Sequence, residues 1–311
     1  MAPTKTHPDF SIFIPTYNRA HTLARTLKSI QDSTYNNLEV IIIDDGSQDN
    51  TIDLVKTWQV TAPFPITYAW QENQGKHAAH NHALKLARGK LFITLDSDDS
   101  LLPDALKQLW KYWENIPQES REKFAGVAGI CLDEEGRLSG DPYPKDFMDS
   151  NYLDIFRHYR MNGERREALR VEVLRKYPYP RFPGERHMRP TLILRRMAHE
   201  YMIRFTNTPV QINRHAPDGI SANRFNYRFR NPQGFTLYYQ EEITLHREHH
   251  LPKQLFRLHI QYLRFALHAR IPIDEQKCHC WKRHWWYMAL PKATSLYILD
   301  ILKAKIRGIR R

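Results

Sequence analysis

Asp96, Asp98 and Asp99 place three carboxylates within four positions at the end of an apolar run. Residues 91–99 read Leu-Phe-Ile-Thr-Leu-Asp-Ser-Asp-Asp, and the apolar part is typical of a buried strand. Carboxylates this close repel one another and do not all stay ionised without a cationic partner. A divalent cation, Mn²⁺ or Mg²⁺, is the natural partner, because these ions combine a few carboxylates with phosphate oxygens. The alternative is an ordinary strand end at which Asp99 or Ser100 caps the next helix.

Polar turns also follow two earlier apolar runs. Residues 10–16 and 38–43 are predicted strands, and they lead into the turns Pro15-Thr16-Tyr17-Asn18 and Asp44-Asp45-Gly46-Ser47. The carboxyl ends of parallel strands meet at one edge of a sheet, so the three turns should face one crevice. Two acidic turns and an Asn-bearing turn at one edge predict a ligand site rather than a solvated surface.

Strands and helices alternate over the first 130 residues. Strands are expected over 10–16, 38–43, 66–70 and 91–95, and helices over 21–32, 51–58, 76–88 and 103–113. Apolar strands separated by helices are typical of a mostly parallel α/β sheet covered on both faces. Gly89 is expected to end the third helix with a positive φ. A further strand is predicted over 124–132 and further helices over 190–201, 251–268 and 281–309.

The composition allows one large or two modest domains. The chain has 311 residues, of which 41% are hydrophobic. It contains no run near the roughly 20 apolar residues of a membrane-spanning helix, and its N-terminus lacks the apolar stretch of a signal peptide. The three cysteines predict no disulfide framework, so a cytoplasmic location is expected. Cys278-His279-Cys280 is spaced too closely for an ordinary zinc site.

The basic charge is concentrated at the C-terminal end. Residues 246–311 contain 14 Lys or Arg against 4 Asp or Glu, a local +10 of the total +12. A nucleic-acid-binding surface would more often spread such charge over the fold, so no nucleic-acid partner is expected. An apolar stripe with a basic flank is typical of a helix lying on an anionic membrane surface. The alternative is a helix packed on the protein with its cations in water. The stripe residues are Ile298, Leu302, Ile306 and Ile309.

Several segments together resemble glycosyltransferase family 2. The segments are Ile-Pro-Thr-Tyr-Asn-Arg at 14–19, Ile-Asp-Asp-Gly-Ser at 43–47, Glu-Asn-Gln-Gly-Lys at 72–76 and Leu-Asp-Ser-Asp-Asp at 95–99. Their order and spacing are similar to the family's over about residues 8–115. The resemblance implies a GT-A type, Rossmann-like sheet with a helical C-terminal extension. It also implies a GT-A domain over 8–245, with a nucleotide-sugar half (8–115) and an acceptor half (116–245), followed by a basic helical region (246–311).

The resemblance implies a role for each site residue. Asp45 would accept a hydrogen bond from the base or ribose, and Gly46 would let the ligand approach the backbone. Lys76 would place a positive charge near the pyrophosphate. Asp98 would be the main metal ligand, with Asp96 on the metal or the ribose. The other residues assigned to the donor site are Pro15, Thr16, Tyr17, Asn18, Asn73 and Ser97.

Inverting transfer needs a carboxylate that takes the proton of the acceptor hydroxyl. Phe182-Pro183-Gly184-Glu185 and the segment 231–239 resemble bacterial capsule and cell-surface polysaccharide members, which makes Glu185 the candidate base. The alternative is that Glu185 complements the dipole of the helix expected over 190–201 or pairs with Arg186. The competing carboxylates are Glu164, Glu167 and Glu172.

The phosphate side differs from many relatives, which carry Arg where this chain has His80. Nearby, His77 and His82 are expected on the surface. Arg214, His215 and residues 218–221 fall where such enzymes place a loop over the donor.

The expected function is therefore inverting, metal-dependent transfer of a sugar from a nucleotide diphosphate donor to a glycan or lipid-linked acceptor, in surface polysaccharide synthesis. The expected location is the cytoplasm, with the protein peripheral at the inner face of the membrane. A nucleotidyltransferase would need a Gly-rich phosphate loop after the first strand, and residues 16–19 contain no glycine. The remaining alternatives are a non-catalytic nucleotide-sugar binder and a basic peripheral membrane protein.

Overall fold

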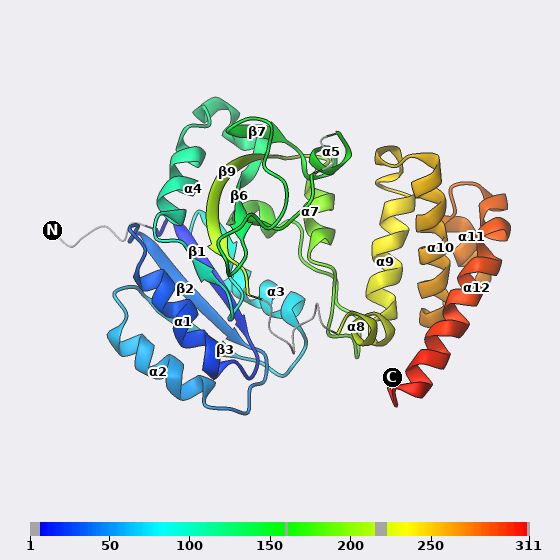
Figure 1. Cartoon of the computed structure of the whole chain (residues 1–311), viewed down its shortest axis with the longest axis horizontal. Helices are drawn as coiled ribbons and strands as arrows, with labels where there is room; N and C mark the ends of the chain where they lie inside the picture. Colours follow the sequence, from blue (N-terminus) through cyan, green and yellow to red (C-terminus); the bar gives the residue numbers. More distant parts are fainter. Residues whose placement is uncertain (1–6, 159–160, 215–222, 310–311) are drawn as a thin grey trace. The chain divides into compact units, whose positions relative to one another are not determined.

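The computed structural model describes residues 7–158, 161–214 and 223–309 (Figure 1). The chain forms two compact units. The first comprises Met1–Tyr179 and Arg196–Ala216, and the second comprises Pro180–Arg195 and Pro217–Arg311. These units divide the chain differently from the expected regions 8–245 and 246–311. Basic charge marks only the last helices, whereas α9 (Pro232–Ile243), which precedes them, packs along α10 (Pro252–Ala269) in the same unit.

The first unit is built on one mixed sheet with the strand order β3-β2-β1-β4-β8-β6-β9-β5, and β7 pairs with β9. The first four strands are parallel and agree with the predicted ones: β1 (Phe10–Thr16), β2 (Leu38–Asp44), β3 (Ile66–Trp70) and β4 (Leu91–Thr94). The others are β5 (Ser100–Leu101), β6 (Phe124–Leu132), β7 (Phe147–Ser150), β8 (Arg165–Arg170) and β9 (Met202–Ile212). Strand β8 runs antiparallel to both of its neighbours, β4 and β6, whereas β6 and β9 pair parallel, so the sheet is mixed beyond β4.

Helices cover this sheet and make up most of the second unit. The first unit contains α1 (Ala20–Gln31), α2 (Thr51–Thr61), α3 (Lys76–Leu86), α4 (Ala105–Glu114), α5 (Tyr152–His158), α6 (Val171–Leu174) and the 3₁₀ turn η1 (Gln118–Lys123). Helix α7 (Thr191–Met197) crosses the boundary between the units. The second unit contains α8 (Arg224–Arg230), α9 (Pro232–Ile243), η2 (Arg247–His249), α10 (Pro252–Ala269), α11 (Ile273–His279) and α12 (Arg283–Ile306).

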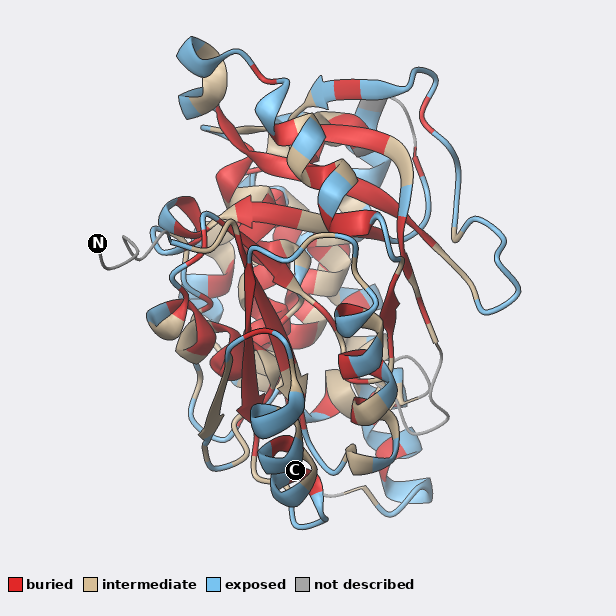
Figure 2. Ribbon diagram, turned by 90° about the vertical axis from the view of Figure 1, so that its left-hand side faces the viewer, coloured by how far each residue is buried: buried red, intermediate tan, exposed pale blue. Residues whose placement is uncertain are grey.

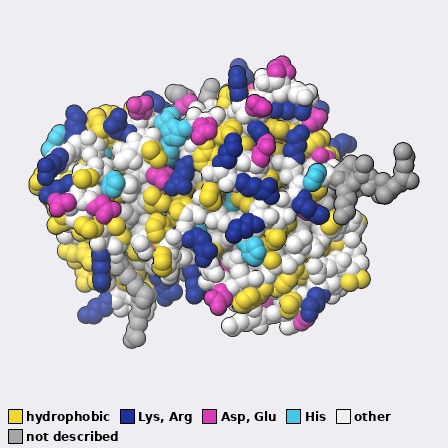
Figure 3. Space-filling model, turned by 180° about the vertical axis from the view of Figure 1, so that it is seen from behind, with side chains coloured by type: hydrophobic (Ala, Val, Ile, Leu, Met, Phe, Trp, Pro, Cys, Tyr) yellow, Lys and Arg dark blue, Asp and Glu magenta, His cyan; other side chains and the backbone are white. Residues whose placement is uncertain are grey.

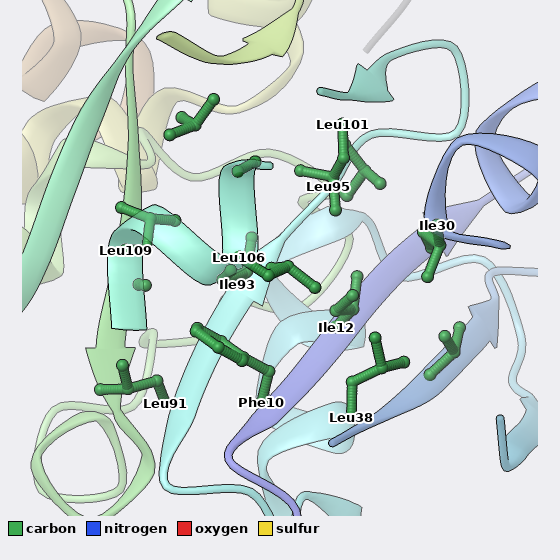
Figure 4. Packing of buried hydrophobic residues seen from close by; sticks show 14 of the residues in the cluster. Phe10, Ile12, Ile30, Leu38, Leu91, Ile93, Leu95, Leu101, Leu106 and Leu109 are labelled. Atoms are coloured by element: carbon green, nitrogen blue, oxygen red, sulfur yellow. The ribbon is translucent and has the colours of Figure 1, made fainter. Parts of the chain in front are cut away.

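The core of the first unit lies between the sheet and its helices. Phe10 and Ile12 of β1 are fully buried, as are Leu106 and Leu109 of α4 (Figure 4). Strands β1, β2, β4 and β6 are buried almost throughout, whereas many helices are buried on one side only (Figure 2). Burial of both sheet faces explains the continuous apolar runs in the sequence.

Gly89 has a different role from the one expected. Helix α3 ends at Leu86, before the glycine, and Gly89 has no positive φ. Instead, a Cβ at this position would lie 2.5 Å from the backbone nitrogen of Ser11. Close approach of two backbones therefore requires glycine here.

The surface is basic and mixed in character. Lys and Arg side chains occur all over the face shown in Figure 3, interspersed with hydrophobic ones.

In the part of the chain that the structure describes, no helix combines the length and the apolar character needed to cross a membrane. The cysteines are free: Cys131 and Cys280 are buried and Cys278 is exposed.

Candidate functional site

The turns after β1 and β2 lie side by side, as predicted. The backbone N–H of Asp45 donates to the carbonyl of Thr16 at 2.8 Å. The N–H of Asn18 donates to Ser47 Oγ at 2.8 Å, and Asn18 Oδ1 accepts the N–H of Gln48 at 2.8 Å. Asn18 has a φ of 53°, a conformation that asparagine adopts more readily than most residues. Asn18 therefore connects the two turns through its backbone and its side chain.

Asp45 anchors the loop that follows β3. Its Oδ1 accepts Gln71 Nε2 and the N–H of Gln74, both at 2.8 Å, and its Oδ2 accepts the N–H of Gly75 at 2.7 Å. The residue is only 6% exposed. Helix α3 begins at Lys76, directly after this loop. Asp45 therefore determines where α3 starts, a role that the sequence did not indicate.

Gly46 and Asn73 lie against each other. Gly46 has a φ of +92°, and a Cβ there would lie 3.1 Å from the backbone nitrogen of Asn73. Glycine is required both by this conformation and by the close approach of the Asn73 loop.

The residues of the β1 end differ in exposure. Pro15 and Thr16 pair with Ile43 and Asp44 of β2 inside the sheet, and Thr16 is 2% exposed. The ring of Tyr17 is 47% exposed at the carboxyl end of β1. An exposed ring beside a polar turn can serve as a wall for a planar base.

Asp96 is held ionised by two cations. Lys76, at the start of α3, forms an ion pair with Asp96 Oδ1. Burial works to raise the pKa of Asp96, but the charges of Lys76 and of Arg166 on β8 outweigh it and hold the pKa below its usual range. Strand β8 therefore contributes to the site, a contribution that the sequence analysis did not predict.

The other two aspartates are less easily ionised. Burial, together with the charge of Asp96, raises the pKa of Asp98 above its ordinary value. The same two causes raise the pKa of Asp99 to about 7, against the opposing charge of Arg166. Ser97, between Asp96 and Asp98, is buried. The expectation that three adjacent carboxylates repel one another is consistent with these shifts.

The turn that carries these acids is fixed from both sides. Arg25 and Thr26 of α1 donate to the carbonyls of Asp98 and Asp99, at 3.1 and 2.8 Å. On the other side, Asp99 Oδ1 accepts the N–H of Arg214 at 2.8 Å.

The alternative in which Asp99 or Ser100 caps the next helix is wrong. Helix α4 starts later, at Ala105, with Asp104 at the capping position. Asp99 is instead tied to the end of β9.

The carboxylates of this turn could hold a divalent cation, although they do not form a complete coordination shell by themselves. Among the described residues, no three His, Cys, Asp or Glu side chains gather as a ready metal site. Asp98 is half-buried, and a cation beside it would favour its ionised form. Mg²⁺ is usually held by one or two carboxylates, with substrate phosphates completing the shell. Asp98, with Asp96 next to it, supplies the required oxygens.

A polar network behind the acids was not found from the sequence. Arg166 Nε donates to Gln211 Oε1 at 2.6 Å, and Gln211 Nε2 donates to both Asp99 Oδ2 and Asn213 Oδ1 at 2.6 Å. Asn213 in turn donates to Glu164. The available signal was a strand with four charged residues, Arg-Arg-Glu-Ala-Leu-Arg, which is unusual for a strand in the middle of a sheet. The network holds Asp99 in place from β8 and β9.

Two histidines of α3 are buried, so the expected surface position of His77 is wrong. His80 packs its ring against Phe13, Phe92 and Tyr179. Burial, with a smaller effect of the Lys76 charge, lowers the pKa of His80 to about 3. His80 is therefore neutral at pH 7 and does not replace the arginine that relatives carry.

Glu185 lies in the second unit, at the amino end of α9. Its Oε1 accepts the N–H of Gln233 at 2.6 Å, and its Oε2 accepts the N–H of Gly234 at 2.8 Å. The carboxylate is thus oriented by a helix that lies much later in the sequence, and not by α7, the next helix along the chain. The alternative expected this carboxylate at the helix over 190–201, whereas its oxygens meet α9 instead. The role of Glu185 as base stays a prediction. His215 and residues 218–221, expected to form a loop over the donor, lie outside the described residues.

Solved structures with a similar fold cover nearly the whole chain. One is Staphylococcus aureus TarS, residues 1–349, in complex with UDP-GlcNAc, with a TM-score of 0.60 and 15% identity over 97% of this chain and 92% of that chain. Another is the mannosyltransferase PcManGT from Pyrobaculum calidifontis in complex with GDP-Man and Mn²⁺, with a TM-score of 0.55 and 21% identity over 95% and 88%. The fold is GT-A-like, as expected.

The sequence comparisons assign one segment of the chain to a family. Residues 11–120 match the model of Glycosyl transferase family 2. The chain is 37% identical to the GalNAc(5)-diNAcBac-PP-undecaprenol beta-1,3-glucosyltransferase of Campylobacter jejuni over 135 residues, a stretch that covers 42% of this chain and 41% of the relative. It is 39% identical to the chondroitin synthase of Escherichia coli over 163 residues, which cover 51% of this chain and 23% of the relative. The chain thus spans less than half the length of these relatives.

Proposed function

We propose that the chain is an inverting, metal-dependent glycosyltransferase that moves a sugar from a nucleotide diphosphate donor to a hydroxyl group. One observation carries this proposal. Asp45 fixes the loop before α3, and α3 in turn presents Lys76 to Asp96, next to the half-buried Asp98. A lysine and two carboxylates at the edge of a parallel sheet suit a sugar diphosphate with its cation. The match of residues 11–120 to Glycosyl transferase family 2 supports the same function.

Each described group would have a defined task in the reaction. The ring of Tyr17 would lie against the base, and Asp96 would bind the ribose or the metal. Lys76 would balance negative charge on the phosphate side. A divalent cation held by Asp98 would stabilise the departing diphosphate. Glu185, already oriented by α9, would take the proton from the acceptor hydroxyl.

The acceptor is proposed from a relative. The name of the Campylobacter jejuni protein gives a glycan linked through diphosphate to undecaprenol. We therefore propose a glycan or lipid-linked glycan acceptor and a role in surface polysaccharide synthesis. The enzyme would act on the cytoplasmic side of the membrane, where nucleotide sugars are available.

A donor screen tests the proposal. The full chain is incubated with UDP-, GDP- and dTDP-sugars and either Mn²⁺ or Mg²⁺, and released nucleotide diphosphate is measured with and without chelator. Metal-dependent release from one donor is the expected result. Tight nucleotide binding without release from any donor, alone or with lipid-linked glycans, would instead identify a non-catalytic nucleotide-sugar binder.

A further inference from the structure

Helix α12 turns its apolar side outward. Large apolar side chains exposed on it are Tyr287, Met288, Ile298, Leu299, Ile301, Leu302 and Ile306. Its buried side is made of small or polar residues together with one tryptophan: Trp286, Ala289, Ala293, Asp300 and Ala304. A helix on a protein surface normally has the reverse arrangement, with the apolar side packed inward. The outward side is therefore an unpartnered apolar stripe.

An ion-pair cluster fixes this orientation. Arg264 of α10 donates through Nε and Nη2 to the two carboxylate oxygens of Asp300, at 2.7 and 2.6 Å. His268 Nε2 lies 3.0 Å from the same carboxylate. Turning α12 about its axis to bury the stripe would expose Asp300 and break these contacts, leaving Arg264 unpaired. Alanines on the inner side allow α12 to approach α10 closely, and Figure 1 shows the two helices alongside each other.

The charges of α12 indicate what covers the stripe. Lys292, Lys303 and Lys305 are exposed, as is Arg307 directly after the helix. The only acid in α12 is Asp300, which is buried within the ion-pair cluster. A second copy of the chain, packed stripe to stripe, would bring these like charges together. A surface that is apolar inside and anionic outside would complement both properties.

Two aromatic side chains extend the same pattern. Trp281 lies just before α12 and Tyr287 lies in its first turns, and both are exposed. Trp and Tyr are enriched at membrane–water interfaces, because their rings are apolar with a polar tip. The amino end of the helix thus carries groups suited to the headgroup level.

We propose that the outward side of α12 is a docking surface for an anionic phospholipid bilayer. The helix lies in the plane of the interface, with Ile298, Leu302 and Ile306 among the acyl chains and the lysines at the lipid phosphates. This inference does not depend on the proposed transferase activity.

Vesicle sedimentation with the full chain tests the proposal. The vesicles are phosphatidylcholine alone, or phosphatidylcholine with 30% phosphatidylglycerol. We expect at least about tenfold stronger binding to the anionic vesicles, weakening as NaCl is raised and the charges are screened. The triple variant I298Q/L302Q/I306Q should lose at least about tenfold in binding. K292E/K303E/K305E should lose the preference for anionic lipid.

Matched controls come from α2, which carries exposed Ile52, Lys56 and Val60. I52Q/V60Q and K56E should bind vesicles like the unchanged protein. Thermal unfolding establishes that each variant is folded, which is expected because all changed side chains are exposed. Equal vesicle binding by I298Q/L302Q/I306Q and the unchanged protein would overturn the proposal. A dimer in light scattering that the same triple variant abolishes, without vesicle binding, would overturn it in favour of a second copy.

Discussion

Asp45 at the end of β2 accepts the backbone N–H of Gly75 at 2.7 Å, and α3 begins at the very next residue. A carboxylate of one strand thus positions a helix that follows another strand. Since Lys76 then reaches Asp96, the contact links three of the turns at the sheet edge. Asp45 belongs to the architecture of the site, whatever it also contacts in the donor.

The substitution Asp45→Asn should loosen this arrangement. An amide offers one acceptor oxygen where the carboxylate uses two, so at least one backbone N–H of the loop loses its partner. Hydrogen bonds to charged groups contribute about 1.5–3 kcal/mol each, so the loss should weaken nucleotide binding about tenfold or more. Hydrogen exchange at Gln74 and Gly75 should accelerate in the absence of nucleotide. Unchanged exchange with weakened binding would assign Asp45 to the ligand alone.

The substitution Asp98→Asn should remove metal-dependent nucleotide binding. Among the residues that the structure describes, none forms an ion pair with Asp98 comparable to that of Lys76 with Asp96, so Asp98 supplies the carboxylate best suited to a cation. Titration calorimetry with nucleotide diphosphate and Mn²⁺ should show a loss of about tenfold to hundredfold. Asp53→Asn, at an exposed position of α2, should leave the titration unchanged. If Asp98→Asn bound nucleotide with the same affinity as the unchanged protein, both with and without chelator, the metal would have to lie elsewhere.

The substitution Glu185→Gln tests the base and the helix contact together. As a base, Glu185 is needed for transfer but not for donor binding. As a partner of Gln233 and Gly234, it is needed for stability, since Gln presents one acceptor to two donors. We expect transfer to fall at least about a hundredfold while nucleotide affinity is retained. Retained transfer with a lowered melting temperature would leave Glu185 with its structural role only.

Glu167→Gln is the matched comparison for Glu185→Gln. Burial raises the pKa of Glu167, whose carboxylate lies on β8 near Arg166. If Glu167 rather than Glu185 were the base, Glu167→Gln would abolish transfer and Glu185→Gln would not.

His80 should make the protein less stable in mild acid. Its pKa is lowered from 6.5 to about 3 in the folded state, so below pH 6.5 the unfolded chain binds a proton that the folded chain does not. The free energy of unfolding should fall by about 1.4 kcal/mol per pH unit in this window, or about 2 kcal/mol between pH 7 and 5. Urea unfolding of His80→Leu should lack this contribution. Exposed His21→Gln should keep it, and identical slopes for His80→Leu and the unchanged protein would contradict the burial argument.

Asp300→Asn should destabilise the second unit. Burial opposes ionisation of Asp300, but hydrogen bonds from His268 and Arg264 hold its pKa below its usual range. Removing one member of a buried charge cluster costs about 3–5 kcal/mol, because the partners stay buried without compensation. A lowered folded-state pKa stabilises the protein above pH 3.8, so the difference between variant and unchanged protein should shrink as the pH falls below that value. Glu248→Gln, at an exposed position, provides the control in chemical unfolding. An equal loss of unfolding free energy in Glu248→Gln and Asp300→Asn would contradict a special role of Asp300.

The sequence was sufficient for the parallel part of the sheet because each strand is one continuous apolar run. Phe10–Thr16 and Ile66–Trp70 coincide with their predicted ranges, and the polar turns after β1 and β2 meet as expected. Local pattern determines both features, since a parallel sheet places every strand end on the same edge.

The antiparallel part of the sheet could not be predicted from the sequence, and the reason is physical. Arg166 reaches Asp96 and Asp99 only because β8 is inserted next to β4, and this pairing joins residues more than 70 positions apart. Likewise, nothing near Glu185 in the chain shows that its partners are Gln233 and Gly234. Contacts between distant segments depend on tertiary packing, which periodicity does not encode.

Strand β9 emerges from the ribosome last among the strands, yet β5, β6 and β7 all pair with it. Until Ile212 has been synthesised, three earlier strands lack a neighbour and present open edges that invite aggregation. The excursion through Pro180–Arg195 delays this closure further. Shortened versions for expression should therefore keep everything up to the end of β9, because a cut at the family 2 segment would leave the sheet unfinished.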